Sequence, residues 1–375
     1  MEVKGREPAG IPGHVAILFI AVIMLSGGYF LTTLTANPTS RLAAIFSFVE
    51  PGTGVTGTLE LARPFTEATA DSQGKLRPPA TIDWARNPEH GYAKYSNKAP
   101  GSYLYGIPVY GVLYIVERIA GLQPLEPKLT YINMYLLNLL MTVLPSAIMA
   151  FYLARMAIKL TGIHWSGALA FSLLTWHGSL LWVYSTNVWG HVPAAAAVTF
   201  AIWNLLKIPV GQPEVAKQPE VENPPSIWPA LWCGFWAGYS VLAEYSCAFV
   251  VAGLGVVFLY RRNWRLLVFF IVGGIGPLIA HLVYHGYCFG APLSTANAFN
   301  NPVFRQEGAA FSLPKPGIIL ELLFLPYRGL FQYSPLLILA LFVFRKKCWR
   351  TRPALVWLCL GVFGAFLLMN ASFVK

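Results

Sequence analysis

Residues 227–285 read IWPALWCGFWAGYSVLAEYSCAFVVAGLGVVFLYRRNWRLLVFFIVGGIGPLIAHLVYH. In this stretch Glu244 is the only charged residue before a basic turn that contains Arg261, Arg262 and Arg265. A helix needs about 20 apolar residues to cross a hydrocarbon layer of about 30 Å. The stretch therefore predicts three membrane-crossing helices, at about 227–243, 246–260 and 266–285.

The composition of the whole chain agrees with this pattern. Of 375 residues, 56% are hydrophobic and 11% are charged, and the mean hydropathy is +0.54. A soluble domain has about a quarter of its residues charged, so lipid must solvate much of this chain. The net charge of +11 comes from short Lys and Arg clusters between apolar runs, which argues against a nucleic-acid partner. The five cysteines show no paired spacing, so the sequence predicts neither a disulfide framework nor a zinc site.

When the same criterion is applied to the rest of the sequence, the chain is expected to be all-α, a polytopic transmembrane helical bundle of about nine spans. These spans are expected to form one domain over residues 1–375. The first apolar run is too long for a signal-peptide core, so we expect a retained anchor. The six further spans are expected at about 14–34, 130–153, 163–184, 191–207, 333–344 and 354–371.

The placement of Lys and Arg predicts the orientation, because basic residues in short loops resist translocation. The basic clusters fall on the side of the N-terminus, which is therefore expected in the cytoplasm. The linker at about 208–226, rich in Pro and Glu, lies on the same side and is expected to be flexible and without chemistry. Two long loops, at about 35–129 and 286–332, remain on the outer face.

The first outer loop contains an apolar segment, residues 101–119. A tenth span here would place the basic residues of 345–352 outside, so we expect a helix lying in the outer interface instead. Its tyrosines are expected at headgroup level. They are Tyr103, Tyr105, Tyr110 and Tyr114.

The same loop carries candidate catalytic and anion-binding groups. It has several carboxylates, among them Glu50 and Asp83, and the segment YSNKAPG at 95–101 with Tyr95 and Lys98. A lysine at the start of a helix can bind an anion together with the helix amides. The simpler interpretation is a lysine that extends to lipid headgroups.

Two ionisable residues lie at the outer ends of predicted spans. His191 follows YSTNVWG at 184–190. Ionisable groups at such depth are candidates for function, although a histidine there can also be purely structural. Glu244 requires a partner or a wet cavity, and a hydrogen bond across helices would explain it as well as catalysis does.

Arg328 in the second outer loop precedes a predicted span. A guanidinium there can hold a phosphate bidentately, or it can simply anchor to headgroups. Outer carboxylates together with Lys and Arg suit transfer from a lipid phosphate, because a carboxylate accepts the proton of the acceptor while cations hold the departing phosphate.

Four motifs together resemble the C-type glycosyltransferase (GT-C) superfamily, in particular its bacterial and archaeal relatives of the lipid A aminoarabinose transferases and the protein O-mannosyltransferases. They are YSNKAPG at 95–101, YSTNVWGH at 184–191, CFGAP at 288–292 and YRGLFQYSP at 327–335, and the similarity covers essentially the whole chain.

The resemblance implies transfer of a sugar from a polyprenyl-phosphate donor to an unidentified acceptor, on the periplasmic or extracellular face of a bacterial or archaeal inner membrane. Lys98 matches the lysine that contacts the donor phosphate, and Arg328 and Tyr95 are expected beside it. No cofactor is certain, and a divalent metal remains open.

The chain departs from the superfamily pattern at three places. Where relatives have an acidic pair before an arginine like Arg41, this chain has Asn-Pro-Thr-Ser at 37–40. The expected base is therefore Asp83, with Glu50 second. His191 stands where relatives carry a second acid. An imidazole can serve as a base or an orienting group, but the loss of a carboxylate weakens the argument for a metal site.

The third departure is at the end of the chain, because relatives usually continue beyond a segment like the one that ends at Lys375. This suggests a truncated member. The alternatives to a transferase are therefore a non-catalytic protein that binds or transports a lipid-linked sugar, and an inactive truncated paralogue. A carrier would be expected to use polar residues buried at the middle of the bilayer.

Overall fold

The computed structural model describes residues 10–30, 35–70, 76–124, 126–209, 226–304, 312–327, 329–344, 349 and 352–373. This part of the chain is mostly helical, with two small antiparallel strand pairs. Several of the predicted features lie outside the described residues. They are Arg328, the 212–225 part of the linker, and the basic residues Lys4, Arg6, Arg345, Lys346, Lys347 and Arg350.

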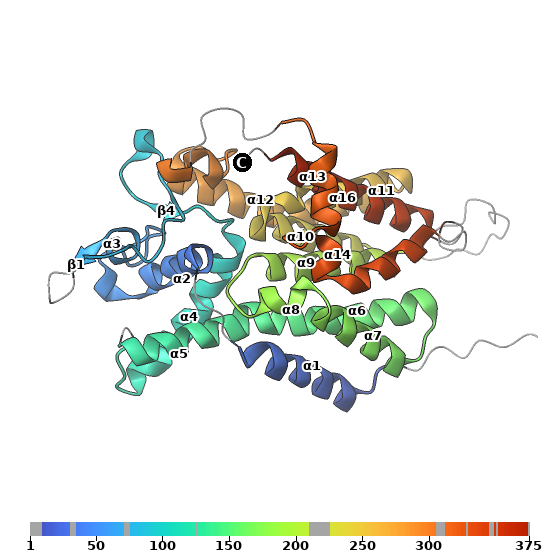
Figure 1. Cartoon of the computed structure of the whole chain (residues 1–375), viewed down its shortest axis with the longest axis horizontal. Helices are drawn as coiled ribbons and strands as arrows, with labels where there is room; N and C mark the ends of the chain where they lie inside the picture. The colour runs from blue at the N-terminus through green and yellow to red at the C-terminus, as the bar shows by residue number, and fades with distance from the viewer. Residues whose placement is uncertain are drawn as a thin grey trace, which may run out of the picture.

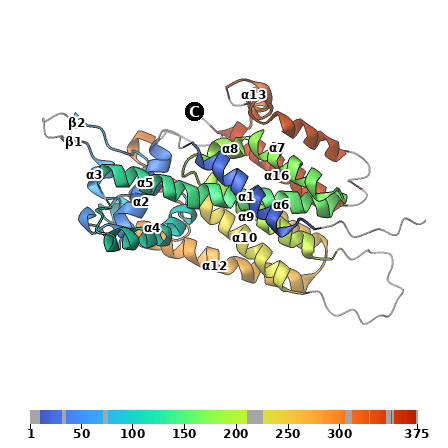
Figure 2. The same ribbon diagram turned by 90° about the horizontal axis from the view of Figure 1, so that it is seen from below.

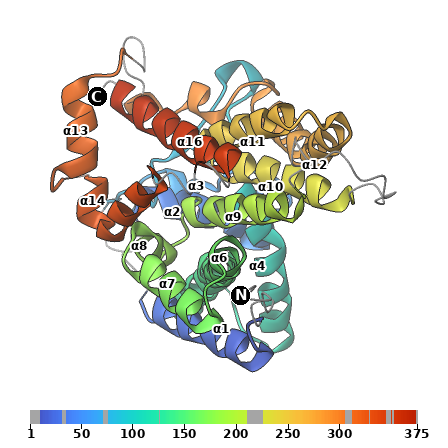
Figure 3. The same ribbon diagram turned by 90° about the vertical axis from the view of Figure 1, so that its right-hand side faces the viewer.

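The elongated body of the molecule is a bundle of helices that run along its length (Figure 1). Seen from the end, α9 lies between α6 and α10 (Figure 3). The helices of the bundle are α1 (Gly13–Gly28), α6 (Leu144–Thr161), α7 (Trp165–His177), α8 (Leu180–Ser185), α9 (His191–Lys207), α10 (Trp228–Ala243), α11 (Ala248–Tyr260), α12 (Trp264–Phe289) and α16 (Pro353–Ser372).

Three of the described helices are long and apolar enough to cross a membrane, as expected of a membrane protein. They coincide with three predicted spans. The first, Lys128–Thr161, joins α5 (Pro127–Asn138) to α6 through a π-helical turn, Leu139–Val143. The other two are α12 and α16. The nine-span arrangement stays a prediction.

Two other predicted spans differ in form from a continuous α-helix. The 163–184 span is divided between α7 and α8, because the Ser179 hydroxyl accepts a hydrogen bond from the Leu181 amide and starts a new helix. The 333–344 span is a 3₁₀-helix, η7 (Pro335–Phe344).

Glycines bring α10 and α12 into direct backbone contact. A Cβ on Gly234 would overlap the carbonyl of Phe270, and one on Gly273 would overlap the carbonyl of Leu231. In an apolar environment, helices associate through such close packing of small residues. The two glycines therefore fix the spacing of this helix pair.

The polar segments gather at one end of the bundle (Figures 1 and 2). They begin with α2 (Ala36–Val49), which packs against α4 (Gly101–Ile119), a helix with the predicted bounds. Between them lie η1 (Pro51–Thr53), α3 (Arg63–Thr66), β1 (Thr69–Ala70) paired with β2 (Leu76–Arg77), β3 (Trp84–Ala85), η2 (Pro88–His90) and β4 (Tyr95–Ser96), which pairs with β3.

Two of the four α4 tyrosines predicted at headgroup level are buried in the protein, so they do not contact lipid headgroups. Tyr103 and Tyr110 are 1% and 0% exposed. The ring of Tyr110 packs edge-on against Phe46 of α2, and that of Tyr103 against Tyr284 of α12. Since α4 lies against other helices, its buried face needs aromatic side chains for the protein core.

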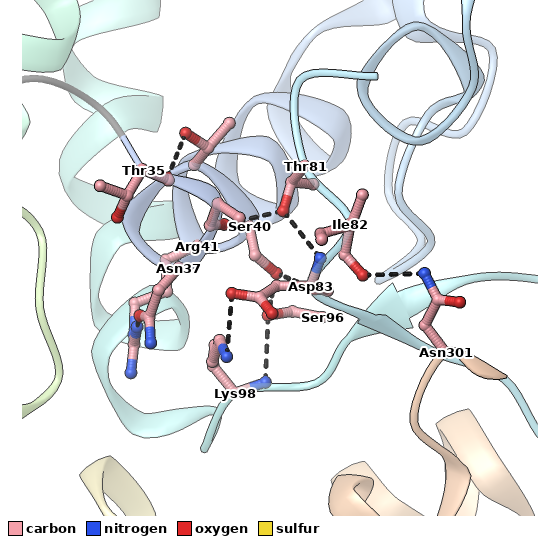
Figure 4. A network of polar contacts seen from close by, with 12 residues as sticks. Thr35, Asn37, Ser40, Arg41, Thr81, Ile82, Asp83, Ser96, Lys98 and Asn301 are labelled. Carbon is pink, nitrogen blue, oxygen red and sulfur yellow. Dashed lines mark hydrogen bonds and ion pairs between the residues drawn. The ribbon is translucent and has the colours of Figure 1, made fainter. Parts of the chain in front are cut away.

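The segment that follows α12 folds back onto the segment between α2 and α4. The Arg86 amide donates to the Phe299 carbonyl at 2.8 Å, and the Asn301 amide donates to the Trp84 carbonyl at 2.9 Å. The Asn301 side chain donates to the Ile82 carbonyl at 3.1 Å (Figure 4). Residues far apart in the sequence thus meet at this end. The segment contains η5 (Ala296–Phe299) and η6 (Pro302–Phe304), and α13 (Pro316–Phe324) and α14 (Leu330–Tyr333) follow.

Candidate functional site

A buried arginine lies at the centre of the polar end. Arg41 of α2 is 1% exposed. Its Nη2 lies 3.1 Å from Oε1 of Glu244, and its Nε donates to the Ser102 hydroxyl at 3.0 Å. Its Nη1 donates to the side chain of Asn37, one helical turn earlier (Figure 4). These contacts hold the guanidinium in one orientation.

Glu244 follows the last residue of α10 in an extended conformation, at the start of the short connection to α11. Besides Arg41, its Oε1 approaches Nδ1 of His191, the first residue of α9, at 3.3 Å. Gly190 permits this arrangement, because a Cβ there would collide with Glu244 Oε1 and lie 2.6 Å from Arg41 Nη2. The Glu244 carboxylate therefore joins α2 and the start of α9 to the end of α10.

A second ion pair lies beside the first. Lys98 Nζ is 3.0 Å from Asp83 Oδ2, and these side chains are 18% and 12% exposed (Figure 4). The β3–β4 pair brings the two residues together, since Trp84 is opposite Ser96. Ser40 of α2 supports the pair by donating from its hydroxyl to the Asp83 carbonyl at 2.5 Å.

The two ion pairs act as one electrostatic unit, which we call the charged cluster: Arg41, Asp83, Lys98, His191 and Glu244. Burial lowers the pKa of Lys98, and the nearby carboxylates of Asp83 and Glu244 oppose this shift. Burial also lowers the pKa of Arg41, with Glu244 and Asp83 again opposing. Two cations and two carboxylates thus balance in a largely buried site.

An apolar cavity of about 250 Å³ opens beside the charged cluster. His191, whose side chain is 47% exposed, forms part of its wall. The cavity lies between α8 and α9 on one side and α14 and η7 on the other. Its apolar lining includes Leu180, Leu181, Tyr184, Val192, Leu330 and Leu337. The charged cluster is therefore next to a space that suits a hydrocarbon chain.

The structure brings together four of the residues predicted for the site, namely Asp83, Lys98, His191 and Glu244. Tyr95 belongs elsewhere. Because side chains alternate along a strand, it points away from the Ser96 side, and its ring packs on Phe289 with a centroid distance of 5.6 Å. Burial raises the pKa of Tyr95 to about 12.

Glu50 also lies outside the charged cluster. It is 3% exposed and accepts a hydrogen bond from the Tyr110 hydroxyl. Burial raises the pKa of Glu50, and the nearby Glu117 carboxylate acts in the same direction. Asn133 donates to Glu117 at 3.1 Å. Glu50 therefore stabilises the contact between α2 and α4, and the structure gives it no position beside Lys98.

Sequence reasoning did not include Arg41 among the site residues, although a signal was present. Arg41 is the only charged residue in the α2 sequence, as Glu244 is in the 227–260 stretch. Two opposite charges, each alone in an apolar helix or hairpin, are expected to pair with each other. The sequence gave no such signal for Gly190, because its role depends on the side chains of Arg41 and Glu244, which only the fold brings next to it.

The described residues do not form a metal site. No group of three His, Cys, Asp or Glu side chains converges among them. In addition, the two carboxylates of the charged cluster are already paired with Lys98 and Arg41. The residues present therefore do not fit the divalent metal that the resemblance left open.

No family model, curated protein or solved structure matches this chain. The superfamily resemblance therefore stays a prediction carried by the four motifs.

Proposed function

We propose that this chain is a membrane glycosyltransferase that moves a sugar from a polyprenyl-phosphate donor to an acceptor on the outer face of the cell membrane. The observation that carries the proposal is the position of the charged cluster directly beside the apolar cavity, with His191 common to both. A lipid phosphate needs cations for its head and an apolar surface for its chain. The cations of the charged cluster and the apolar surface of the cavity are next to each other at the polar end of the bundle.

Lys98 is the group that binds the donor phosphate. Its ammonium is partly exposed and sits on a flexible stem, so it can exchange the Asp83 carboxylate for a phosphate oxygen. Arg41 is fully buried and has three side-chain partners. Arg41 is therefore a positioning residue that holds Glu244, which in turn orients His191.

Asp83 becomes the base when Lys98 moves to the phosphate. The oxygen of the acceptor hydroxyl forms a bond to the anomeric carbon of the sugar, and its proton passes to an oxygen of Asp83. The bond between the anomeric carbon and the phosphate oxygen breaks, and its electron pair leaves with the polyprenyl phosphate. Lys98 stabilises the charge that develops there. This direct displacement inverts the anomeric configuration.

A second candidate function is binding or transport of a lipid-linked sugar without transfer. One observation favours it: both carboxylates of the charged cluster are already paired, Asp83 with Lys98 at 3.0 Å and Glu244 with Arg41 at 3.1 Å. A site whose carboxylates are both paired with cations can bind a lipid phosphate without accepting a proton from an acceptor. The transfer experiment below distinguishes the two functions.

Binding is tested with polyprenyl phosphate itself, titrated against the chain in lipid nanodiscs. Lys98→Met removes one charge-assisted contact and should weaken binding about tenfold or more. Lys94→Met is the matched control, because Lys94 pairs with the largely exposed Glu67 at the same distance of 3.0 Å. Equal affinities in the wild type and in Lys98→Met would exclude the assigned phosphate site.

Transfer is tested with a panel of radiolabelled polyprenyl-phosphate sugars and cell-envelope acceptors. Asp83→Asn should abolish transfer while polyprenyl phosphate still binds. Full transfer by this variant would refute the base. A wild-type chain that binds the lipid phosphate but transfers no sugar from the panel would favour the second candidate function.

A further inference from the structure

A second cavity lies toward the opposite end of the bundle. It has a volume of about 320 Å³ and opens between α6, α9 and α10, which are adjacent in Figure 3. Lys207 in its wall is separated from His191 by almost the whole of α9, about 24 Å at 1.5 Å per residue. The cavity is therefore independent of the charged cluster. Its lining includes Tyr152, Phe200, Trp203, Asn204, Lys207 and Trp236, and we call it the basic–aromatic pocket.

The walls of the basic–aromatic pocket are aromatic rings in contact with one another. The ring of Tyr152 lies 5.2 Å from that of Phe200 and 5.6 Å from that of Trp203, between centroids. Phe200 contacts Trp236 of α10 at 5.0 Å. Contacts between these rings join α6, α9 and α10, so the cavity belongs to the packed structure of the bundle.

Two cations converge on one indole of the pocket. The guanidinium of Arg155 lies 4.6 Å from the centre of the Trp203 ring, and Nζ of Lys207 lies 5.6 Å from the same ring. Lys159, one turn beyond Arg155 on the same face of α6, also acts electrostatically on Lys207. No carboxylate of the described residues forms an ion pair with either of the two cations. Converging positive charges favour a bound anion.

The surroundings indicate where such an anion comes from. Trp228, Trp232 and Trp236 recur every four residues on one face of α10, and the first two are 61% and 44% exposed. Exposed tryptophans near helix ends mark the level of lipid headgroups. Basic pockets between membrane helices bind anionic headgroups at that level. A ligand that reaches the pocket along this face is a membrane lipid.

We propose that the basic–aromatic pocket binds the phosphate headgroup of an anionic phospholipid from the leaflet opposite the charged cluster. The phosphate lies beside Lys207 in the wall of the pocket, and the guanidinium of Arg155, over the same Trp203 ring, adds to the attraction. The part of the acyl chain nearest the headgroup lies along the rings of Tyr152 and Trp203. A volume of about 320 Å³ suits a headgroup, since pockets for larger ligands extend to about 1,000 Å³.

The test is native mass spectrometry of the delipidated full chain titrated with phosphatidylglycerol or with phosphatidylcholine of the same acyl chains. We expect phosphatidylglycerol to bind more tightly. Arg155→Gln combined with Lys207→Gln should weaken its binding about 25-fold, as the product of about fivefold for each basic residue near an anionic lipid. Phosphatidylcholine binding should change little.

Arg262→Gln combined with Arg265→Gln is the matched control. These two arginines lie in the turn before and at the start of α12, and both are exposed, but neither is over an aromatic ring among the described residues. Circular dichroism verifies that both double variants remain folded. Equal affinity for the two lipids, or an equal loss in the control, would overturn the proposal. Displacement of phosphatidylglycerol by an equal concentration of soluble glycerol phosphate would also overturn it, because the site would then bind a free phosphate and not a lipid.

Discussion

Replacement of Glu244 by leucine is expected to destabilise the fold strongly, because it leaves the charge of Arg41 buried without its partner. The Arg41 side chain is 2% exposed and that of Glu244 is 21% exposed. Asn37 and Ser102 remain as hydrogen-bond partners but carry no charge. The charged cluster would change from balanced to an excess of one positive charge. Loss of one partner from a buried pair costs about 3–5 kcal/mol, and the partial exposure of Glu244 places this case at about 3 kcal/mol.

The assay is unfolding of the detergent-solubilised chain in increasing dodecyl sulfate, followed by tryptophan fluorescence. Arg41→Met combined with Glu244→Leu should recover more than half of the loss, because no unpaired charge remains buried. Glu67→Leu is the control and should leave the unfolding curve almost unchanged, since the Glu67 side chain is 48% exposed and water solvates its carboxylate. If Glu244→Leu were as stable as the wild type, or the double variant no better than the single one, the pair would not have the role assigned to it.

Three further changes test other parts of the structure. Gly190→Ala places a methyl group against the central ion pair and should lower sugar transfer at least tenfold while the fold is retained; unchanged transfer would show that the contact is not needed. Gly234→Ala should destabilise the chain by about 3 kcal/mol, at the upper end of the usual cost of overpacking, because the new methyl group meets the backbone carbonyl of Phe270. Gly276→Ala is the control and should not destabilise the chain, because the space around Gly276 is open. Burial raises the pKa of Glu50 above 4.5, so its contribution to stability is complete below that pH and is lost as the pH rises through the folded-state pKa. Glu50→Gln should flatten this decline in unfolding titrations above pH 4.5, and a decline identical to that of the wild type would contradict the assignment.

One contact within the charged cluster joins residues that lie near each other in the sequence. Lys98 and Asp83 lie on either side of a short strand pair, so local sequence brought them close to each other. Glu50 looked equally suitable, because it is another acid in the same loop. It differs only in its neighbours, since Tyr110 and Glu117 of α4 enclose it in a separate network. The spacing of residues along the sequence does not show which acid is enclosed in which network.

The sequence by itself determined that the chain is helical and apolar. The lengths of its uncharged runs require helices, because an apolar environment offers no other partner for backbone amides and carbonyls. It also determined which ionisable residues need partners. Only the tertiary structure decided which partners they have. Arg41 and Glu244 are 203 positions apart, and they meet because the starts of α2 and α9 and the end of α10 converge where Gly190 leaves room. Such a contact depends on packing among several helices, and no single segment encodes it.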